Sequence, residues 1–335
     1  MQPAVDPCAS LASTLRKAKR VLIATHVNPD GDAVGSAVGL AHIALILGCE
    51  TRLFLRAGLP DFLSWLHLPA PVVQSLDILH EWTPDLLLVC DCGDAGRTGP
   101  ELEPFLTGRS LPDRDWSDVA VANIDHHVSN PGFADINWVE PDRAATGELV
   151  GLLAEHLELS LEGELGQAVY LALVSDTGNF TFSNTSPGAF AMAARIVAAG
   201  LDIADFTSKF ENTWTINRMH LWGRLFSEVR LHAGGAVASA VVHREYLDEL
   251  GLSNEDLEGF ASWLRRLRGS RVGLFVREDA RGVSKISLRS MGDVDVQVVC
   301  AKFGGGGHAA AAGAELALGP EAAAEAVLEE IIRQL

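Results

Sequence analysis

Three apolar runs of strand length, each ending in or followed by a potential metal ligand, constrain the fold more than any other feature of this sequence. They cover residues 20–26, 85–90 and 118–124. Uninterrupted apolar strands are typical of a parallel sheet that is covered on both faces. Apolar residues at helical spacing follow the first run over 33–48, and this strand–loop–helix order indicates an α/β fold. Such sheets bind ligands beyond the carboxyl ends of their strands, so we expect the functional site there.

The length of the chain predicts two domains, because a single core rarely serves more than roughly 250–300 residues and this chain has 335. We expect a parallel-sheet domain with helices on both faces over 1–213, a helical linker over 214–235, and a smaller α/β domain over 236–335. Further expected elements are a first helix at 10–19 with Ser10 as its N-cap, strands at 236–243, 272–277 and 283–289, and helices at 254–266 and 320–335.

The balance of charge restricts the class of ligand. A formal net charge of −18 disfavours binding of long nucleic acid, because non-specific binding of nucleic acid requires a basic surface. The most apolar stretch, 34–49, is shorter than the ~20 residues that cross a bilayer, and five cysteines indicate no disulfide framework. We therefore expect a cytoplasmic protein that binds neither membranes nor long nucleic acid stably. Its assembly stays open between monomer and homodimer.

A basic island interrupts this acidic chain between 265 and 289. Two interpretations stay open, either a set of solvated side chains or a surface that faces an anionic ligand. The island consists of Arg265, Arg266, Arg268, Arg271, Arg277, Arg281, Lys285 and Arg289.

Four clusters of aspartate and histidine contain the candidate metal ligands. In the first, an Asn-Pro-Asp-Gly turn brings His26, Asp30 and Asp32 together, although these residues also make good turn chemistry without a metal. The other clusters are Asp91 after the second run, the tandem Asp125, His126 and His127 after the third, and Asp176 after an apolar helical segment. A mixed set of nitrogen and oxygen ligands suits Mn²⁺ or a similar ion.

These four clusters resemble, in order and spacing, the motifs of the DHH phosphoesterase superfamily. The segment 304–313, with its run of glycines before His308, is similar to the G-G-G-H-x-x-A-A-G signature of the DHH-associated C-terminal domain. The resemblance covers nearly the whole chain, and it is greatest to the branch of nanoRNases and 3′-phosphoadenosine 5′-phosphate phosphatases. It implies an enzyme that uses two divalent metal ions, with Mn²⁺ as the expected ion.

The resemblance also implies a role for each residue of the four clusters. One metal would bind His26, Asp30 and Asp91, and the other would bind Asp32, Asp91, His126 and Asp176, so that Asp91 bridges the two. Asp125 would orient a histidine, and His127 would act near the scissile phosphate. The charges agree with this arrangement, because four aspartates offset two divalent cations and leave a site that accepts a phosphate.

In the second domain, the resemblance implies a set of residues that grip the substrate. Backbone N–H groups of the glycine run would cradle a phosphate, whereas a flexible linker is the alternative interpretation. Ala309 departs from the polar or basic residue that often follows the histidine in this family, which leaves the substrate preference open. The expected substrate-binding residues are Arg289, Gly305, Gly306, Gly307 and His308.

Several other residues carry weaker signals. Phe180 and Phe182 follow the fourth cluster, where base stacking and core packing both stay open. The C-x-C pair, Cys90 and Cys92, has no second pair to complete a zinc site, so we expect no thiolate-bound zinc. The remaining histidines, among them His42, His67, His156 and His220, are assigned no role.

The sequence thus predicts hydrolysis of phosphodiester bonds in very short oligonucleotides and linear dinucleotides, with release of mononucleotides, together with removal of phosphate from 3′-phosphoadenosine 5′-phosphate. The alternative enzyme is a manganese-dependent inorganic pyrophosphatase or exopolyphosphatase, although the Ser-Arg-Lys motif of that pyrophosphatase family is absent from the sequence. A processive exonuclease of the RecJ type is disfavoured by the short, acidic chain. The non-enzyme alternative is a nucleotide-sensing protein with the same fold.

Overall fold

The computed structural model describes residues 6–79, 82–212, 214–279, 281–291 and 294–335. The chain forms two compact units, Met1–Thr213 and Trp214–Leu335. Within the described residues, no helix is both long enough and apolar enough to cross a membrane.

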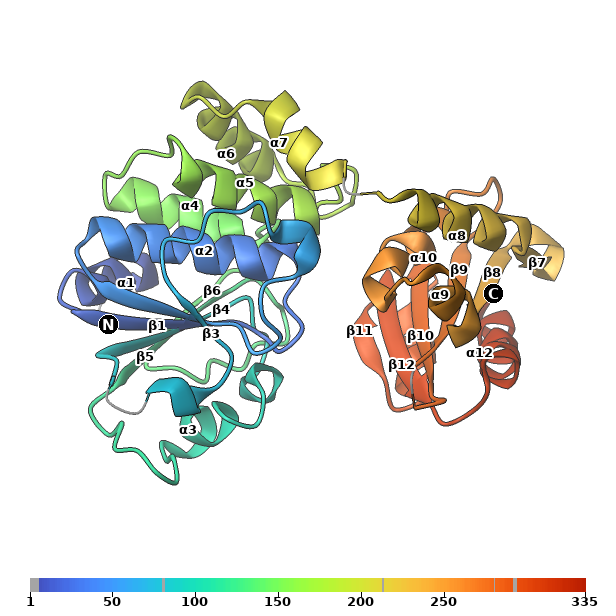
Figure 1. Cartoon of the computed structure of the whole chain (residues 1–335), viewed down its shortest axis with the longest axis horizontal. Coiled ribbons are helices and arrows are strands. Elements are labelled where there is room, and N and C mark those ends of the chain that lie inside the picture. The colour runs from blue at the N-terminus through green and yellow to red at the C-terminus, as the bar shows by residue number, and fades with distance from the viewer. Residues whose placement is uncertain (1–5, 80–81, 213, 280, 292–293) are drawn as a thin grey trace, which may run out of the picture. The chain divides into compact units, whose positions relative to one another are not determined.

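The first unit is an α/β domain (Figure 1). Its strands are β1 (Arg20–Ala24), β2 (Glu50–Phe54), β3 (Val72–Val73), β4 (Leu86–Cys90), β5 (Ala120–Asp125) and β6 (Ile136–Val139). Its α-helices are α1 (Pro7–Leu15), α2 (Gly31–Ile46), α3 (Glu103–Gly108), α4 (Thr146–His156), α5 (Glu164–Asp176), α6 (Pro187–Ala198) and α7 (Ile203–Glu211). Three 3₁₀ turns lie between them, η1 (Asp61–Leu63), η2 (Leu76–Leu79) and η3 (Ala95–Thr98).

The six strands form one parallel sheet in the order β3-β2-β1-β4-β5-β6. The direction in which strands are added reverses between β1 and β4, since β2 pairs with one edge of β1 and β4 with the other. The carboxyl ends of strands at such a switch point are the usual ligand-binding position in this class of fold.

Helices cover both faces of this sheet, as the uninterrupted apolar strands predict. In β1, Val21 and Ile23 pack into the core that contains residues of α1, α2, α4 and α5. Leu22 and Ala24 pack into a second core that contains Phe105 of α3. Figure 1 shows α1 and α2 on one side of the sheet and α3 on the other. The fold expected for this domain is therefore confirmed.

A row of glycines allows α2 and α5 to pack closely. A Cβ atom at Gly35 would lie 2.6 Å from the carbonyl oxygen of Ala168, and one at Gly31 would collide with Ser175. A Cβ atom at Gly39 would be in ordinary contact with Val169 and Leu165, at 3.6 and 3.8 Å, so residues that ascend along α2 meet residues that descend along α5. The two helices are therefore antiparallel.

The first helix begins earlier than the sequence interpretation placed it. Helix α1 starts at Pro7, and the carboxylate of Asp6 accepts a hydrogen bond from the backbone N–H of Cys8. Ser10 lies inside the helix, where its hydroxyl donates to the carbonyl oxygen of Asp6. The prediction of Ser10 as N-cap was wrong because Asp6 followed by proline is the stronger start signal.

The second unit contains a mixed sheet in the order β11-β12-β10-β9-β8-β7. Its strands are β7 (Arg230–His232), β8 (Val237–Val242), β9 (Val272–Glu278), β10 (Ser284–Ser290), β11 (Gly306–His308) and β12 (Ala311–Leu316). Its helices are α8 (Ile216–Ser227), α9 (Arg244–Leu250), α10 (Phe260–Leu264), α11 (Val296–Ala301) and α12 (Pro320–Gln334), with 3₁₀ turns η4 (Ala233–Gly235) and η5 (Asn254–Leu257). Helices α11 and α12 pack against strands of this sheet in one apolar core, and helices α8, α9 and α10 pack against strands of it in another.

Residues 214–235 are part of this second unit and not a linker. Leu221, Trp222 and Leu225 of α8 are buried in one of its cores. Strand β7 pairs with β8, so residues 230–232, which were expected to lie in the helical linker, extend the sheet. The single helix expected over 254–266 is instead a 3₁₀ turn and a short helix, separated at Gly259, whose φ is 85°.

Candidate metal centre

The structure brings the four sequence clusters to one edge of the parallel sheet. His26 follows β1, and Asp125 is the last residue of β5. Asp30 is the N-cap of α2, where its carboxylate accepts hydrogen bonds from the N–H groups of Asp32 and Ala33. Asp91 directly follows β4 with a φ of 53°, a left-handed conformation that costs a residue with a side chain roughly 1 kcal/mol.

Two groups of potential ligands lie side by side at this edge. His26, Asp30 and Asp91 form the first group, and the potential ligand atoms in it lie within 4.8 Å of one another. Asp32, His126 and Asp176 form the second group by the same measure. Asp91 also approaches His126, so its carboxylate lies between the two groups.

His126 has the geometry of a metal ligand. Its Nε2 atom lies 3.7 Å from one carboxylate oxygen each of Asp32, Asp91 and Asp176. Two ligand atoms bound to one ion at about 2.1 Å are roughly 3.0 Å apart in octahedral and roughly 3.4 Å apart in tetrahedral coordination, so small shifts of these side chains suffice to bind an ion. Nδ1 lies 3.2 Å from the carbonyl oxygen of Arg143 and donates to it, which leaves the lone pair on Nε2. The donor set therefore fits a divalent cation.

The N-terminus of α4 holds the second group in place. Backbone N–H groups of Thr146 and Gly147 donate to the two carboxylate oxygens of Asp32 over 2.8 and 3.0 Å. The hydroxyl of Ser36 also donates to Asp32, and the hydroxyl of Thr146 donates to Asp91 over 3.0 Å. Thr146 thus contacts one carboxylate of each group, which fixes their separation.

Without a cation, burial and mutual repulsion oppose ionisation of these carboxylates. Burial raises the pKa of Asp32 well above its usual range, and the charges of Asp91 and Asp176 act in the same direction. Burial raises the pKa of Asp176 to about 6. Burial opposes ionisation of Asp91 as well, but the neighbouring histidines, His26 first, lower its pKa to about 2. A bound cation would favour the ionised form of all these groups.

His127 is held by a carboxylate on one side and a guanidinium on the other. Its Nδ1 donates to Asp125 over 2.7 Å, and Asp125 is fully buried. Nη1 of Arg97 lies 3.2 Å from Nε2 of His127 and donates to it, because an arginine N–H can only donate. Burial acts to lower the pKa of His127, but the carboxylates of Asp125 and Asp91 outweigh burial and raise it.

Sequence reasoning missed several residues that contact these groups, among them Thr146, Arg143, Asn184 and Arg97. Thr146 acts through its backbone N–H and its hydroxyl, and Arg143 acts through its carbonyl oxygen. No pattern of residue types predicts such contacts. Asn184 donates both to the carboxylate and to the carbonyl oxygen of Asp176, and Arg97 reaches His127 from η3. For Arg97, the available signal was a cation six residues after Asp91 in an otherwise acidic and apolar segment.

In the second unit, Arg289 and His308 lie in one row across three strands. Arg289 of β10 is paired with Ala311 of β12, and Ala311 is paired with His308 of β11. Directly paired residues of antiparallel strands point to the same face of a sheet. Within the described part of the chain, no carboxylate forms an ion pair with Arg289, and burial followed by the charge of Arg265 lowers its pKa.

The glycine run forms a tight turn and an edge strand, not a flexible linker. Gly304 has a φ of 74° and Gly307 a φ of 138°. A Cβ atom at Gly305 would lie 2.1 Å from the carbonyl oxygen of Gly313, and one at Gly307 would lie 2.5 Å from that of Ala311. These glycines are therefore required by the close approach of β11 to β12. Among the residues that the structure describes, no strand of this sheet pairs with the other edge of β11.

The structure also bears on three features whose interpretation the sequence left open, namely the phenylalanine pair, the cysteine pair and the basic island. Phe180 packs against the first core and stacks on Phe190 with ring centroids 5.1 Å apart, so core packing explains it. Cys90 and Cys92 are buried free thiols. In the basic island, Arg281 and Lys285 form ion pairs with Glu315. This agrees, for these two residues, with the interpretation as solvated surface side chains.

Comparison with known proteins agrees with this fold. Residues 20–173 match the DHH family, N-terminal domain, and residues 234–335 match the DHHA1 domain. The bifunctional oligoribonuclease and PAP phosphatase NrnA of Thermus thermophilus is 35% identical over 94% of this chain and 90% of its own length. The protein of the same name from Bacillus subtilis is 26% identical over 91% of this chain and 92% of its own length.

A crystal structure of an exopolyphosphatase-related protein from Bacteroides fragilis superposes with a TM-score of 0.86. The identity is 25%, and the match covers 98% of this chain and 96% of the other.

A parallel sheet with paired Asp and His clusters at its switch point, together with these matches, defines a hydrolase that acts on phosphate esters. The chain belongs to the DHH phosphoesterase family and carries a DHHA1 domain after its DHH domain.

Proposed function

We propose that this enzyme hydrolyses phosphodiester bonds in very short oligonucleotides, including linear dinucleotides, to mononucleotides, and that it also removes the 3′-phosphate of 3′-phosphoadenosine 5′-phosphate. The reaction would require two divalent ions, with Mn²⁺ as the working ion. The observation that carries this proposal is the position of the Asp91 carboxylate between two ligand groups, 3.7 Å from His26 on one side and from His126 on the other.

The proposed metal ligands are His26, Asp30 and Asp91 for one ion, and Asp32, Asp91, His126 and Asp176 for the other. Two divalent ions would supply a nucleophile from water and offset the charge of the phosphate. The lone pair of His126 Nε2 is free for such an ion because Nδ1–H is engaged by Arg143.

His127 would act on the substrate from the rim of this centre. Asp125 holds the ring through Nδ1, so Nε2 is the atom that would exchange a proton with the substrate or hold its phosphate. Arg97 would contribute a guanidinium for a phosphoryl oxygen, since no carboxylate within the described residues forms an ion pair with it.

Arg289 and His308 would grip another phosphate of the substrate. The support is their shared row on one sheet face and the lack of a carboxylate partner for Arg289 among the described residues. Of the three glycines expected to contact the substrate, Gly306 and Gly307 would offer backbone N–H groups at the edge of that sheet, whereas the N–H of Gly305 donates to the carbonyl oxygen of Cys300 over 2.9 Å.

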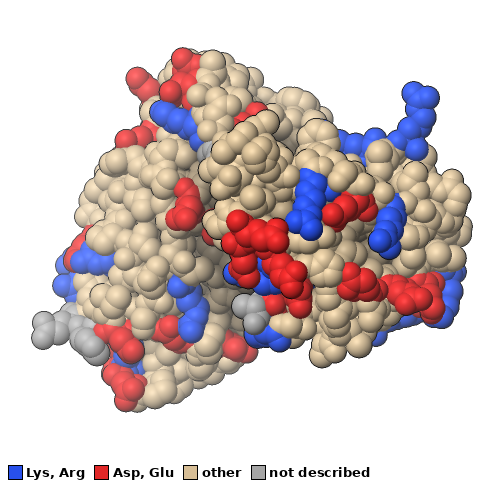
Figure 2. Space-filling view, turned by 45° about the vertical axis from the view of Figure 1, so that its right-hand side comes forward, with Lys and Arg blue, Asp and Glu red and all other residues tan. Residues whose placement is uncertain are grey.

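A short substrate agrees with the charge of the molecule. On the face drawn in Figure 2, Lys and Arg side chains are scattered among acidic and uncharged ones. With a net charge of −18, such a surface would attract a long nucleic-acid strand only weakly outside the proposed substrate-binding residues. The names of the two NrnA relatives agree with this choice of substrates.

The test is a competition among substrates with Mn²⁺ present. The panel contains a 5′-phosphorylated dinucleotide, a long single strand, 3′-phosphoadenosine 5′-phosphate, pyrophosphate and polyphosphate, with chromatography of the products and a chelator control. We expect chelator-sensitive loss of the dinucleotide and of the adenosine bisphosphate, and survival of the long strand. Preferential loss of polyphosphate or pyrophosphate would overturn the proposal in favour of the activity suggested by the name of the Bacteroides fragilis relative.

A further inference from the structure

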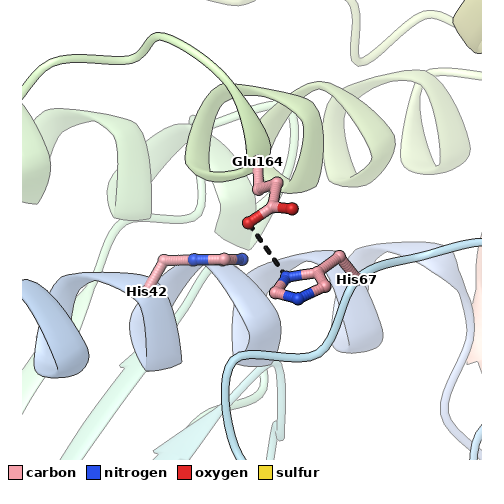
Figure 3. Close-up of side chains that lie close together, drawn as sticks. All are labelled: His42, His67 and Glu164. Atoms are coloured by element: carbon pink, nitrogen blue, oxygen red, sulfur yellow. Dashed lines mark ion pairs between the residues drawn. The ribbon is translucent and has the colours of Figure 1, made fainter.

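A second group of potential metal ligands lies in the first unit, away from the centre described above. It consists of His42 on α2, His67 in the segment between η1 and β3, and Glu164 at the start of α5. One ligand atom from each residue lies within 4.8 Å of the others. Figure 3 shows the three side chains converging, with the ring of His42 directed toward the other two.

His42 is the unusual member of this group. Only 6% of the residue is exposed, and its Nε2 atom has no hydrogen-bond partner among the described residues. A buried polar atom without a partner is rare, because it loses its bond to water and gains nothing in return. Burial lowers the pKa of His42, so the imidazole is neutral near neutral pH and keeps the lone pair that a metal requires.

The other two members are accessible and already paired. Nδ1 of His67 lies 2.9 Å from a carboxylate oxygen of Glu164, and their side chains are 61% and 50% exposed. This ion pair accounts for His67 and Glu164 but leaves His42 unexplained. Exposed side chains can rotate, so they can close on an ion beside the fixed ring of His42.

We propose that His42, His67 and Glu164 bind a Zn²⁺ ion that is distinct from the ions of the phosphoesterase centre. Two imidazoles and one carboxylate are a donor set that zinc accepts, with bonds of about 2.0–2.2 Å and a fourth position for water. The proposal rests on the buried ring of His42, whose Nε2 has no hydrogen-bond partner among the described residues, and on its two neighbours, and it is independent of the substrate of the enzyme.

This ion would fasten the far ends of the two helices that carry ligands of the phosphoesterase centre. Helix α2 begins at Asp30 and Asp32, and His42 lies ten residues after Asp32, about 15 Å along the helix. Helix α5 runs antiparallel to it from Glu164 to Asp176. The zinc site therefore joins α2, α5 and the segment around His67 at one end, whereas the catalytic ions join the two helices at the other.

The test measures zinc bound per chain after dialysis of the full-length protein against Zn²⁺, by elemental analysis. His67→Ala and Glu164→Gln remove exposed ligands, so neither change disturbs the core. His156→Ala, at an exposed position of the same unit, is the matched control. We expect one zinc fewer per chain in the two ligand variants and the wild-type content in the control.

Combination with Asp91→Asn separates this site from the phosphoesterase centre. In that background, adding His67→Ala should lower the zinc content by one further ion per chain and remove the part of the zinc-dependent rise in melting temperature that this ion produces. Equal zinc content in the wild type, His67→Ala and Glu164→Gln would overturn the proposal. Failure of the proposed substrate specificity would leave these zinc measurements unchanged.

Discussion

Nη1 of Arg97 lies 3.2 Å from Nε2 of His127, on the opposite side of the ring from the hydrogen bond to Asp125. A side chain that donates both to a ring nitrogen and to a phosphoryl oxygen would couple the position of His127 to the binding of substrate. The contact joins η3 to the residue that follows β5 by two positions.

The first prediction concerns this arginine. Arg97→Ala removes a charge-assisted hydrogen bond worth about 1.5–3 kcal/mol. We therefore expect this change to lower kcat/KM by roughly 10- to 100-fold. Bound metal per chain should not change, because Arg97 contacts no proposed ligand of the two ions. The matched control is Arg109→Ala, which removes an exposed arginine paired with Asp135. Kinetics of Arg97→Ala that equal those of Arg109→Ala would refute a role for Arg97 with the substrate.

The second prediction concerns Asp91, whose carboxylate lies between the two ligand groups. Asp91→Asn removes a charge that both proposed ions require, so we expect loss of at least one metal per chain and a fall in kcat of at least about 1,000-fold. Circular dichroism should be unchanged, since Asn has nearly the same size and also tolerates the left-handed conformation. Wild-type activity in this variant would exclude the bridging role.

The third prediction concerns the hydroxyl of Thr146, which donates to Asp91 over 3.0 Å. Partners that orient metal ligands typically contribute 10–100-fold to metal affinity or activity. We therefore expect Thr146→Val to weaken Mn²⁺ binding by about that factor and Thr146→Ser to restore it. Titration of activity with Mn²⁺ measures the change. Thr107→Val, which removes an exposed hydroxyl of α3, is the control. Identical Mn²⁺ titrations for the valine variants at both positions would contradict the expected effect.

The sequence predicts those parts of the site that lie at the ends of strands. Asp91 and Asp125 follow apolar runs, and the parallel arrangement of these runs is enough to bring the two aspartates to one edge of the sheet. Thr146 could not be found in this way, because its function comes from a helix N-terminus that meets Asp32 from 114 residues away in the sequence. Contacts of this kind depend on tertiary packing and leave no local pattern.

The second unit illustrates a different limit. The sequence interpretation placed a helical linker at 214–235 because a helix was expected from Trp214 to Arg230 and the glycine pair after it signals a turn, and the turn signal was correct in itself. What it could not reveal was the pairing of β7 with β8 across that turn. Likewise, no pattern joins His42 to His67, since 25 residues and a change from helix to loop separate them.

The last prediction tests the packing of α2 on α5, which sets the distance between Asp32 and Asp176. A Cβ atom at Gly35 would lie 2.6 Å from the carbonyl oxygen of Ala168 and 2.8 Å from the backbone nitrogen of Ala172. Neither backbone atom can move without shifting α5, so Gly35→Ala should destabilise the first unit by about 1–3 kcal/mol despite the better helix propensity of alanine.

At roughly 2–4 °C per kcal/mol, this change lowers the melting temperature of that unit by about 2–12 °C. The matched control is Gly108→Ala at the end of α3, where a Cβ atom would have no neighbour within 4 Å. We expect Gly108→Ala to leave the melting temperature unchanged or slightly higher. Calorimetry of both variants decides the matter, and an equal melting temperature in the two would mean that α5 moves away from α2 at no cost. In that case the separation of Asp32 and Asp176 would be set by the ends of the helices and not by the glycine contact.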